Sequence, residues 1–263
     1  MDLRDEYRPK KFADFLGNKR TIQCLKNSIL QGTFSTGTLF HGDPGTGKTA
    51  LAYVYATGLG CMNFKDDLCG ECDPCKFALS NFQEGSAGSG ISVWDCTQIG
   101  ENRLDDLIKH HLNYFSWTKI GKTVHIFDEF HRIRDRSQDK FLKPLEKPRS
   151  NLFIFCLIDI SDFEMALRQR VTIFKTECPS LEEIIPWLRR ICDEKGIAIL
   201  EPEALIQVAI DADRLPRECL RILHEIRMLQ EPLTVRLVKE IFVAKTSSKD
   251  NISRYRILED PLT

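Results

Sequence analysis

The sequence predicts a parallel α/β domain with a glycine-rich loop after its first strand, followed by a small all-helical domain. Five short apolar runs alternate with helical patterns between residues 38 and 175. A glycine-rich segment, GDPGTGKT at residues 42–49, follows the first run, and the strand pattern stops at residues 178–180. We therefore expect an α/β domain over residues 1–177, a helical domain over residues 178–243 and a tail over residues 244–263.

The composition is that of an ordinary folded protein with no dominant charge. The chain has 263 residues, 42% of them hydrophobic, which is enough to bury a core. Its 37 Lys and Arg residues nearly balance 38 Asp and Glu, so any DNA contact must come from a local patch. The first residues do not have the pattern of a secretory signal and no eighteen consecutive residues are apolar, so we expect a cytoplasmic protein without a membrane segment.

The apolar runs are expected to be strands, because each is short and is bounded by polar or turn residues. Uninterrupted apolar runs fit strands that are buried on both faces, and the spacing leaves room for crossover helices, so the sheet should be parallel. The expected strands are 38–40, 91–95, 124–127, 152–158 and 171–174, with helices at 48–58, 101–115 and 137–146. In the helical domain Ser180 and Gly196 bound the first helix, and three more helical segments follow at 201–210, 216–229 and 234–243.

The segment GDPGTGKT matches G-x-x-x-x-G-K-[ST], with a strand pattern before it and a helical pattern after it. Its glycines let backbone N–H groups turn toward phosphate oxygens, and the helix N-terminus adds its dipole. Lys48 is expected to reach the terminal phosphates and the Thr49 hydroxyl to bind Mg²⁺. A chance glycine turn is the alternative, and the strand and helix patterns on either side argue against it.

The run VHIFDE, residues 124–129, supplies the second part of a nucleotide-hydrolysing site. A buried strand would deliver Asp128 and Glu129 at its carboxyl end, where parallel sheets bind ligands. We expect Asp128 to hold Mg²⁺ and Glu129 to orient or deprotonate the attacking water. Many strands end in a solvated acidic turn, so this run is informative only together with the phosphate loop. Together they predict hydrolysis of ATP or GTP.

Four of the ten cysteines form a cluster: Cys61, Cys69, Cys72 and Cys75. The two-residue gaps of C-x₂-C-x₂-C let turn backbones aim their sulfurs at one point, and four thiolates close a tetrahedral zinc site. No His follows at ligand spacing, so the site would be structural and not catalytic. An iron–sulfur cluster and four free cysteines in a loop are the alternatives.

The order and spacing of these motifs resemble a known family. A phosphate loop, a C-x₇-C-x₂-C-x₂-C module, a strand ending in DEFH and the run DKFLKPLEKP at residues 139–148 resemble the AAA+ motor subunit, gamma/tau type, of the bacterial DNA polymerase III clamp loader. The resemblance extends from about residue 7 to residue 243. It implies an AAA+ domain with an inserted zinc module and a helical lid, and it favours ATP over GTP.

The resemblance also implies roles for individual residues. Residues 7–9 and 12–17 fall where the family encloses the adenine and ribose, Arg170 falls where an arginine reaches a neighbouring subunit's nucleotide, and Arg217 falls at the lid's sensor-2 arginine. The implied nucleotide-contacting residues are Tyr7, Arg8, Pro9, Gly17, Asp43, Pro44, Gly45, Thr46, Gly47, Lys48, Thr49, Ala50 and Arg217. The implied catalytic residues are Lys48, Asp128, Glu129, Arg170 and Arg217, and the cofactors are ATP, Mg²⁺ and Zn²⁺.

Chemistry supports the two arginines only in part. A guanidinium supplied in trans stabilises charge that develops on the γ-phosphoryl group. Arg217 would lie in the first turn of a helix, where a phosphate would offset its unfavourable interaction with the helix dipole. From the residues alone both are solvated surface arginines, and Arg168 is as good a candidate as Arg170. Likewise Arg132, Arg134 and Arg136 could face DNA or form a solvated basic face.

Three features depart from the family pattern. The fourth strand of the family ends in a Thr or Asn that senses the γ-phosphate, whereas this strand ends in Leu157 and Ile158. Gln169 and Val171 replace the serine and cysteine that flank this arginine, Arg170, in the family. The family's motor subunits also continue into a helical collar domain. This sequence stops before one could form, so we expect it either to be truncated or to assemble by another route.

Three functions follow from these features. The first is an ATPase subunit that works with other AAA+ subunits to load a sliding clamp on primer–template DNA for a DNA polymerase. The second is a nucleotide-binding adaptor with little turnover, which residues 157 and 158 favour and the intact Lys48, Thr49, Asp128 and Glu129 disfavour. The third is an AAA+ switch for another DNA-linked assembly, such as one from a phage, a plasmid or a defence system.

Overall fold

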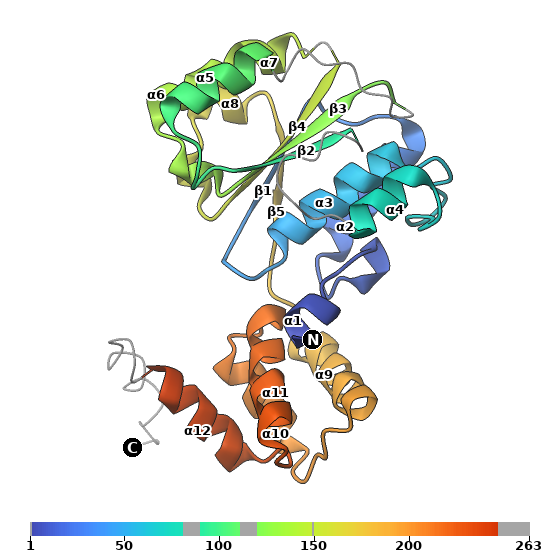
Figure 1. The fold of residues 1–263 in the computed structure, drawn as a ribbon, viewed down its shortest axis with the longest axis vertical. Helices are drawn as coiled ribbons and strands as arrows, with labels where there is room; N and C mark the ends of the chain where they lie inside the picture. The colour runs from blue at the N-terminus through green and yellow to red at the C-terminus, as the bar shows by residue number, and fades with distance from the viewer. Residues whose placement is uncertain (1, 81–89, 111–119, 149, 247–263) are drawn as a thin grey trace, which may run out of the picture. The chain divides into compact units, whose positions relative to one another are not determined.

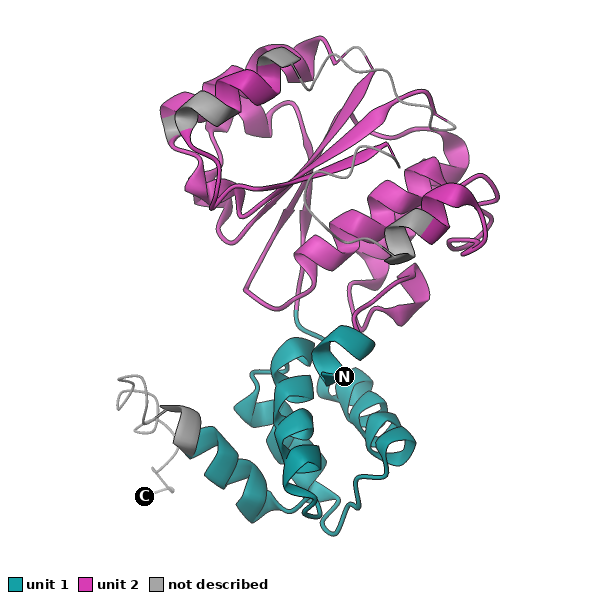
Figure 2. Cartoon of the chain, in the orientation of Figure 1, with its two compact units in different colours: residues 1–7, 178–263 teal, residues 8–177 magenta. Residues whose placement is uncertain are grey.

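The computed structural model describes residues 2–80, 90–110, 120–148 and 150–246. The chain divides into two compact units, one of residues 8–177 and one of residues 1–7 together with residues 178 onward (Figure 2). Among the described residues no helix is long and apolar enough to cross a membrane.

The described part of the larger unit is built on a parallel sheet of five strands in the order β2-β3-β4-β1-β5 (Figure 1). The strands are β1 (Gly37–His41), β2 (Ile91–Asp95), β3 (Thr123–Asp128), β4 (Asn151–Leu157) and β5 (Thr172–Lys175). In register, β1 pairs with β4 through Gly37 and Phe153 and with β5 through Thr38 and Thr172. Since β1 lies between two strands that are more than a hundred residues later, the sheet order is set entirely by long-range contacts.

Helices cover both faces of this sheet, and Figure 1 shows the two layers. One face carries α2 (Lys19–Gln31), α3 (Lys48–Gly60) and α4 (Asp73–Ser80). The other face carries α5 (Glu101–His110), α6 (Asp135–Gln138), α7 (Leu142–Glu146) and α8 (Met165–Arg168). Short 3₁₀ turns connect these elements at Phe12–Asp14 (η1), Phe130–Arg132 (η4), Asp139–Phe141 (η5) and Ile160–Asp162 (η6).

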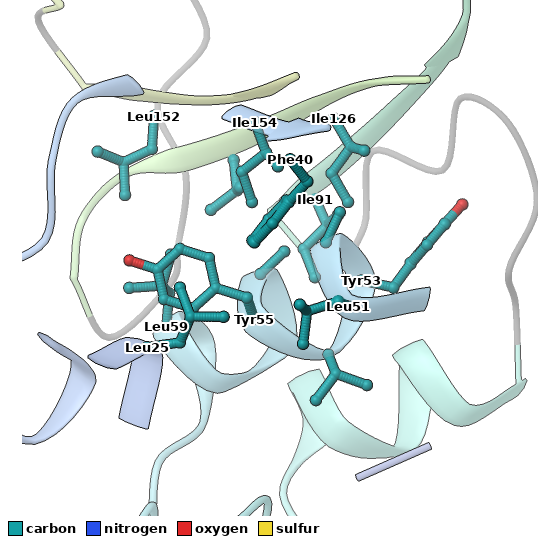
Figure 3. Packing of buried hydrophobic residues seen from close by; sticks show 14 of the residues in the cluster. Leu25, Phe40, Leu51, Tyr53, Tyr55, Leu59, Ile91, Ile126, Leu152 and Ile154 are labelled. Carbon is teal, nitrogen blue, oxygen red and sulfur yellow. The ribbon is translucent and has the colours of Figure 1, made fainter. Parts of the chain in front are cut away.

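Each helical layer encloses its own apolar core. Between α3 and the sheet, Leu51, Tyr55 and Leu59 pack toward Phe40 and Ile154 (Figure 3). The helix α3 is buried around almost its whole circumference, because α2 and α4 pack against it on the side away from the sheet. On the opposite face the core is rich in phenylalanine, and its fully buried rings include those of Phe127, Phe130, Phe141, Phe153, Phe155 and Phe163.

Two elements differ from the sequence prediction. The strand β5 was expected to be buried on both faces, yet three of its four residues are exposed because it is an edge strand covered on one side only. The expected helix over residues 137–146 is instead divided into α6, η5 and α7. The expected helix over residues 101–115 is described as far as His110, and the rest of it lies outside the described residues.

The described part of the helical unit contains α1 (Leu3–Glu6), α9 (Leu181–Lys195), α10 (Glu203–Asp211), α11 (Pro216–Leu229) and α12 (Val235–Thr246). Ser180 and Glu183 form the expected capping box at the start of α9, and Gly196 ends it in the left-handed conformation. Residues 1–7, which the sequence analysis placed with the α/β domain, group with this unit. The Tyr7 hydroxyl donates to Glu194 at 2.5 Å, and the Lys195 ammonium pairs with Glu6. Of the predicted tail, residues 247–263 lie outside the described residues.

A buried glutamine holds the divided helix region together. The Gln138 side chain is 1% exposed; its amide nitrogen donates to the carbonyls of Ile133 and Asp162, at 3.0 and 2.8 Å. Its oxygen accepts the N–H of Glu164 at 2.9 Å. One side chain therefore joins the segment after β3 to the segment after β4.

We predict that Gln138→Leu lowers the free energy of unfolding by about 2–4 kcal/mol. Leucine has a volume similar to that of glutamine, but one buried N–H and two buried carbonyls lose their hydrogen-bond partner. Urea denaturation of the full chain measures this change. Gln23→Leu is the matched control, since Gln23 is exposed on α2 and its loss should change stability by less than about 0.5 kcal/mol. Equal stability of the two variants would contradict the structural role of Gln138.

Candidate nucleotide site and metal centre

The phosphate loop connects the carboxyl end of β1 to the first turn of α3, as the motif requires. Gly42, Gly45 and Gly47 all have positive φ, at 144°, 87° and 93°. A Cβ atom on Gly42 would lie 2.3 Å from the carbonyl oxygen of Thr176, so only glycine fits there. The close approach of residue 176 therefore fixes where the loop leaves the sheet.

Lys48 lies at the centre of this loop, and it is 6% exposed. Its ammonium donates to the carbonyls of Gly42 and Asp43, at 2.8 and 2.9 Å. Burial lowers the pKa of Lys48, although nearby acidic groups, among them Glu129 and Asp128, act in the opposite direction. A buried ammonium with acceptors on the loop itself is well placed to transfer its hydrogen bonds to a phosphate.

The loop is joined to the third strand by a side-chain contact. The Thr49 hydroxyl lies 2.9 and 3.0 Å from the two carboxylate oxygens of Asp128. Burial raises the pKa of Asp128, and the hydrogen bond from Thr49 lowers it in part. A hydroxyl and a carboxylate side by side are the ligands that Mg²⁺ prefers, and its charge would offset the cost of burying the carboxylate. These two residues therefore fit a magnesium site.

Glu129 follows Asp128 in a backbone conformation that is uncommon for a residue with a side chain. Its φ is 53°, and its N–H donates to the Asp128 carboxylate at 3.1 Å. Its carboxylate lies 3.4 Å from the Nε2 atom of His131. A strained residue that is held by its neighbours is often part of a functional site, because the strain fixes the direction of the side chain.

The segment from residue 8 to residue 18 lies beside the phosphate loop. Arg8 packs over the ring of Tyr53 at 5.9 Å, and the Phe15 ring lies 3.5 Å from the position of a Cβ on Gly47. Asn18 exchanges two hydrogen bonds with the backbone of Glu177. Gly17 has a φ of 68°. Thus Arg8, Pro9 and Gly17 belong to the same unit as the loop, whereas Tyr7 groups with the helical unit.

The predicted arginines occupy different environments. Arg170 forms an ion pair with Glu146 at 2.7 Å and donates to the Ala166 carbonyl at 2.5 Å. Arg168 donates to the carbonyls of Phe163 and Ser161, so both arginines have local partners within their own unit. Arg217 is exposed in the first turn of α11 in the helical unit. Their roles toward a nucleotide stay predictions.

The end of β4 offers no polar side chain to a nucleotide phosphate. Leu157 is 1% exposed and packs in the phenylalanine-rich core. The Ile158 carbonyl accepts the N–H of Gly42 at 3.0 Å. Asp159 accepts the N–H of Ser161, and hydrogen bonds from Ser161 lower the pKa of Asp159. The last residue of β4 is therefore a buried leucine.

Sequence reasoning missed Thr176 as part of the site. Its hydroxyl lies 2.8 Å from the Thr46 hydroxyl and donates to the His41 carbonyl at 3.2 Å. Thr176 is 2% exposed and follows β5 directly. A polar residue after a strand is a weak signal, and its meaning depends on knowing that β5 lies next to β1.

The three arginines after β3 are exposed. Arg132 and Arg134 line a hollow of about 500 Å³ together with Ile99, Leu104 and Ser137.

The four clustered cysteines converge at the end of α3. Their sulfur atoms all lie within 4.8 Å of one another, with Cys69 and Cys75 at 3.9 Å and Cys72 and Cys61 at 4.0 Å. Zinc–sulfur bonds of about 2.3 Å in a tetrahedron place the sulfurs roughly 3.8 Å apart. An iron–sulfur cluster holds several atoms between its thiolates and spreads them farther, so the geometry favours a single ion.

The thiols of the cluster differ in their pKa values. Backbone N–H groups of Cys72 and Glu71 lower the pKa of Cys69 to about 6. Burial raises the pKa values of Cys61 and Cys75. A divalent ion at this point would supply the positive charge that buried thiolates need, so the donor set and its spacing fit zinc.

Comparison with known proteins identifies the family. Residues 17–176, more than half of the chain, match the family model described as DNA polymerase III, delta subunit. The chain belongs to this family.

Curated relatives of this DNA polymerase III family member include replication proteins. DNA polymerase III subunit gamma/tau of Mycoplasma pneumoniae is 30% identical over 89% of this chain and 34% of its own length. DNA polymerase III subunit tau of Bacillus subtilis is 28% identical over 83% of this chain and 38% of its own length. Protein STICHEL of Arabidopsis thaliana is 25% identical over 90% of this chain and 19% of its own length. The chain thus spans between a fifth and two fifths of these relatives.

Among solved structures, the Holliday junction branch migration motor RuvB of Thermotoga maritima has a TM-score of 0.63. The two chains are 16% identical, and the match covers 90% of this chain and 72% of the RuvB chain. This similarity shows the AAA+ fold. The predicted fold class and the resemblance to the gamma/tau clamp-loader family are therefore confirmed.

For this DNA polymerase III family member we predict that Cys75→Ser abolishes stoichiometric zinc binding, because a closed four-thiolate site loses a ligand that is fully buried. Elemental analysis of the purified full chain should find about one zinc in the wild type and almost none in the variant.

Cys24→Ser is the control for this substitution, since Cys24 is exposed on α2 and lies outside the cluster. It should keep the wild-type zinc content. Full zinc content in Cys75→Ser, or iron in the wild-type protein, would show that the assignment is wrong.

Proposed function

We propose that this chain is an ATP-binding and ATP-hydrolysing subunit of clamp-loader type, which couples ATP to the loading of a sliding clamp on primer–template DNA during replication. The observation that carries the proposal is the meeting of Lys48, Thr49, Asp128 and Glu129 at one edge of the sheet. The gamma/tau relatives support the link to replication, although the chain matches only part of them.

Each group at this edge has a defined task in phosphoryl transfer. The loop N–H groups and Lys48 bind and orient the phosphates, and Thr49 and Asp128 hold Mg²⁺, which when bound neutralises charge on the β- and γ-phosphates. Glu129 orients the attacking water and accepts its proton. The buried setting strengthens these interactions, since little water competes with them.

The site is completed by arginines from outside the loop. Arg170 serves a neighbouring subunit's nucleotide, so its ion pair with Glu146 must exchange for a phosphate contact in the assembly. Arg217 acts on the phosphates of its own subunit's nucleotide, as the resemblance to the family implies. ATP binding favours the closed assembly, and hydrolysis releases it. The partners are other AAA+ subunits, a sliding clamp, primer–template DNA and a DNA polymerase.

A second candidate is an AAA+ adaptor or switch with weak ATPase activity that serves another DNA-linked assembly. The buried Leu157 at the end of β4 favours it, because no side chain there can report the γ-phosphate.

ATP turnover by the purified protein, with and without a sliding clamp and primer–template DNA, separates these functions. The loader proposal predicts turnover that rises when both partners are present. Tight nucleotide binding without turnover under any condition favours the adaptor. Turnover that responds to another partner and not to a clamp favours the switch.

We predict that Glu129→Gln keeps ATP affinity within about twofold and lowers turnover by about 10²–10⁴-fold, since the variant retains the loop but loses the proton acceptor. A fluorescent-nucleotide titration and a phosphate-release assay measure the two quantities. Glu203→Gln, an exposed position on α10, should change neither. Wild-type turnover in Glu129→Gln would exclude this residue as the base.

We predict that Arg170→Ala leaves nucleotide affinity of the isolated subunit unchanged but lowers turnover of the assembly by about 10³-fold or more, because the guanidinium acts on a neighbour's nucleotide. Arg170→Lys keeps the charge but not the planar fork, so it should restore only part of the activity. Turnover in both variants is compared in the assembled complex. Unchanged turnover in Arg170→Ala would show that Arg170 does not act on a neighbouring subunit's nucleotide.

A further inference from the structure

The loop that carries the cysteine cluster also holds a backbone segment beside the phosphate loop. The Asp67 carboxylate, two residues before Cys69, accepts the N–H groups of Phe12 and Ala13 at 3.0 and 2.9 Å. It also accepts the N–H of Leu68 at 2.8 Å. Hydrogen bonds to an ionised carboxylate are about twice as strong as neutral ones. One side chain from the cysteine loop therefore caps the first turn of η1.

We call residues 12–17 the base segment, because its proposed role is to enclose the adenine and ribose. A second carboxylate fixes the residues just before it, since Asp14 accepts the N–H groups of Lys10 and Lys11 at 2.9 Å each. Four successive N–H groups are thus held by two acids, one local and one from the cysteine loop. The ring of Phe12, 2% exposed, also meets the ring of Phe64 edge-on at 6.2 Å.

The other end of the base segment is tied to the sheet. Asn18 exchanges hydrogen bonds of 3.1 and 2.9 Å with Glu177, which follows β5. Between the two ends, the Phe15 ring rests against Gly47 of the phosphate loop. The position of the base segment therefore depends on two anchors, and one of them belongs to the cysteine loop.

That anchor depends on the metal. Residues 61–72, all of which the structure describes, contain turns and bends but no helix or strand. Leu68 and Phe64 pack this stretch against the core, and the four sulfurs at one point bring its two ends together, where thiolates without an ion repel one another. Losing the ion would release the loop into many conformations, and Asp67 and Phe64 would leave the base segment.

We propose that Asp67 is a positioning residue that couples the zinc module to the base segment, so that zinc occupancy sets the affinity for nucleotide. The proposal rests on the ATP-binding function given above. The four-cysteine module is then more than a structural insertion, because it governs one wall of the nucleotide site while supplying no group to the reaction.

The test compares Asp67→Asn with Asp66→Asn in the full chain. The neighbouring Asp66 pairs with Lys26 and its side chain is 90% exposed, so it is a matched control with the same chemical change. Three quantities are measured: zinc content, amide hydrogen exchange at Phe12 and Ala13, and affinity for a non-hydrolysable ATP analogue.

We expect Asp67→Asn to keep its zinc, to exchange faster at Phe12 and Ala13, and to bind the analogue roughly five- to twentyfold more weakly. Turnover at saturating ATP should stay at the wild-type value, because the loop and β3 are untouched. Removing zinc from the wild type with a chelator should produce the same two changes. In Asp67→Asn, zinc removal should add little, since the coupling is already broken.

Wild-type affinity and exchange in Asp67→Asn would overturn the proposal. An equal loss on zinc removal in the wild type and in Asp67→Asn would also overturn it, because the two effects would then be independent. If the wild type binds no nucleotide, the proposed function fails and the affinity part fails with it. Exchange at Phe12 and Ala13 still decides in that case whether zinc orders the base segment.

Discussion

The hydrogen bonds from the Thr49 hydroxyl to both oxygens of Asp128 join the two halves of the nucleotide site. They require that the first residues of α3 and the last residue of β3 meet, and this happens because β4 alone separates β1 from β3 in the sheet. The rest of the larger unit supports that meeting. The buried α3 fixes the height of Thr49 above the sheet, and the phenylalanine-rich core fixes β3 from the other face.

The same arrangement collects charges that are costly to bury. Burial lowers the pKa of Lys48 and raises the pKa of Asp128, so it favours the neutral form of each group. Cys156, fully buried beside them on β4, has a strongly raised pKa for the same reason. A site in this condition favours a ligand that brings both negative phosphates and a divalent cation, because each buried group then gains a partner of opposite charge.

The main elements could be predicted from the sequence because their signals are local. Runs such as VHIF and motifs such as GDPGTGKT carry their periodicity and turn residues within a few positions. Amphipathic α2 was missed although Ile22, Leu25 and Ile29 have helical spacing. The exposure of β5, the role of Thr176 and the contact of Asp67 with the base segment could not be predicted. Each depends on which distant segment lies alongside, and a single sequence does not record that.

The position of β1 between β4 and β5 has a consequence for the synthesis of the protein. A side chain at position 42 is excluded by Thr176, which lies 134 positions later, and among the described residues β1 pairs only with β4 and β5. Contacts between such distant residues form slowly, because a long loop must close first. A growing chain therefore cannot complete its phosphate site until β5 and Thr176 have left the ribosome. Until then α3 is the neighbouring element, among those described, that can cover the apolar face of β1.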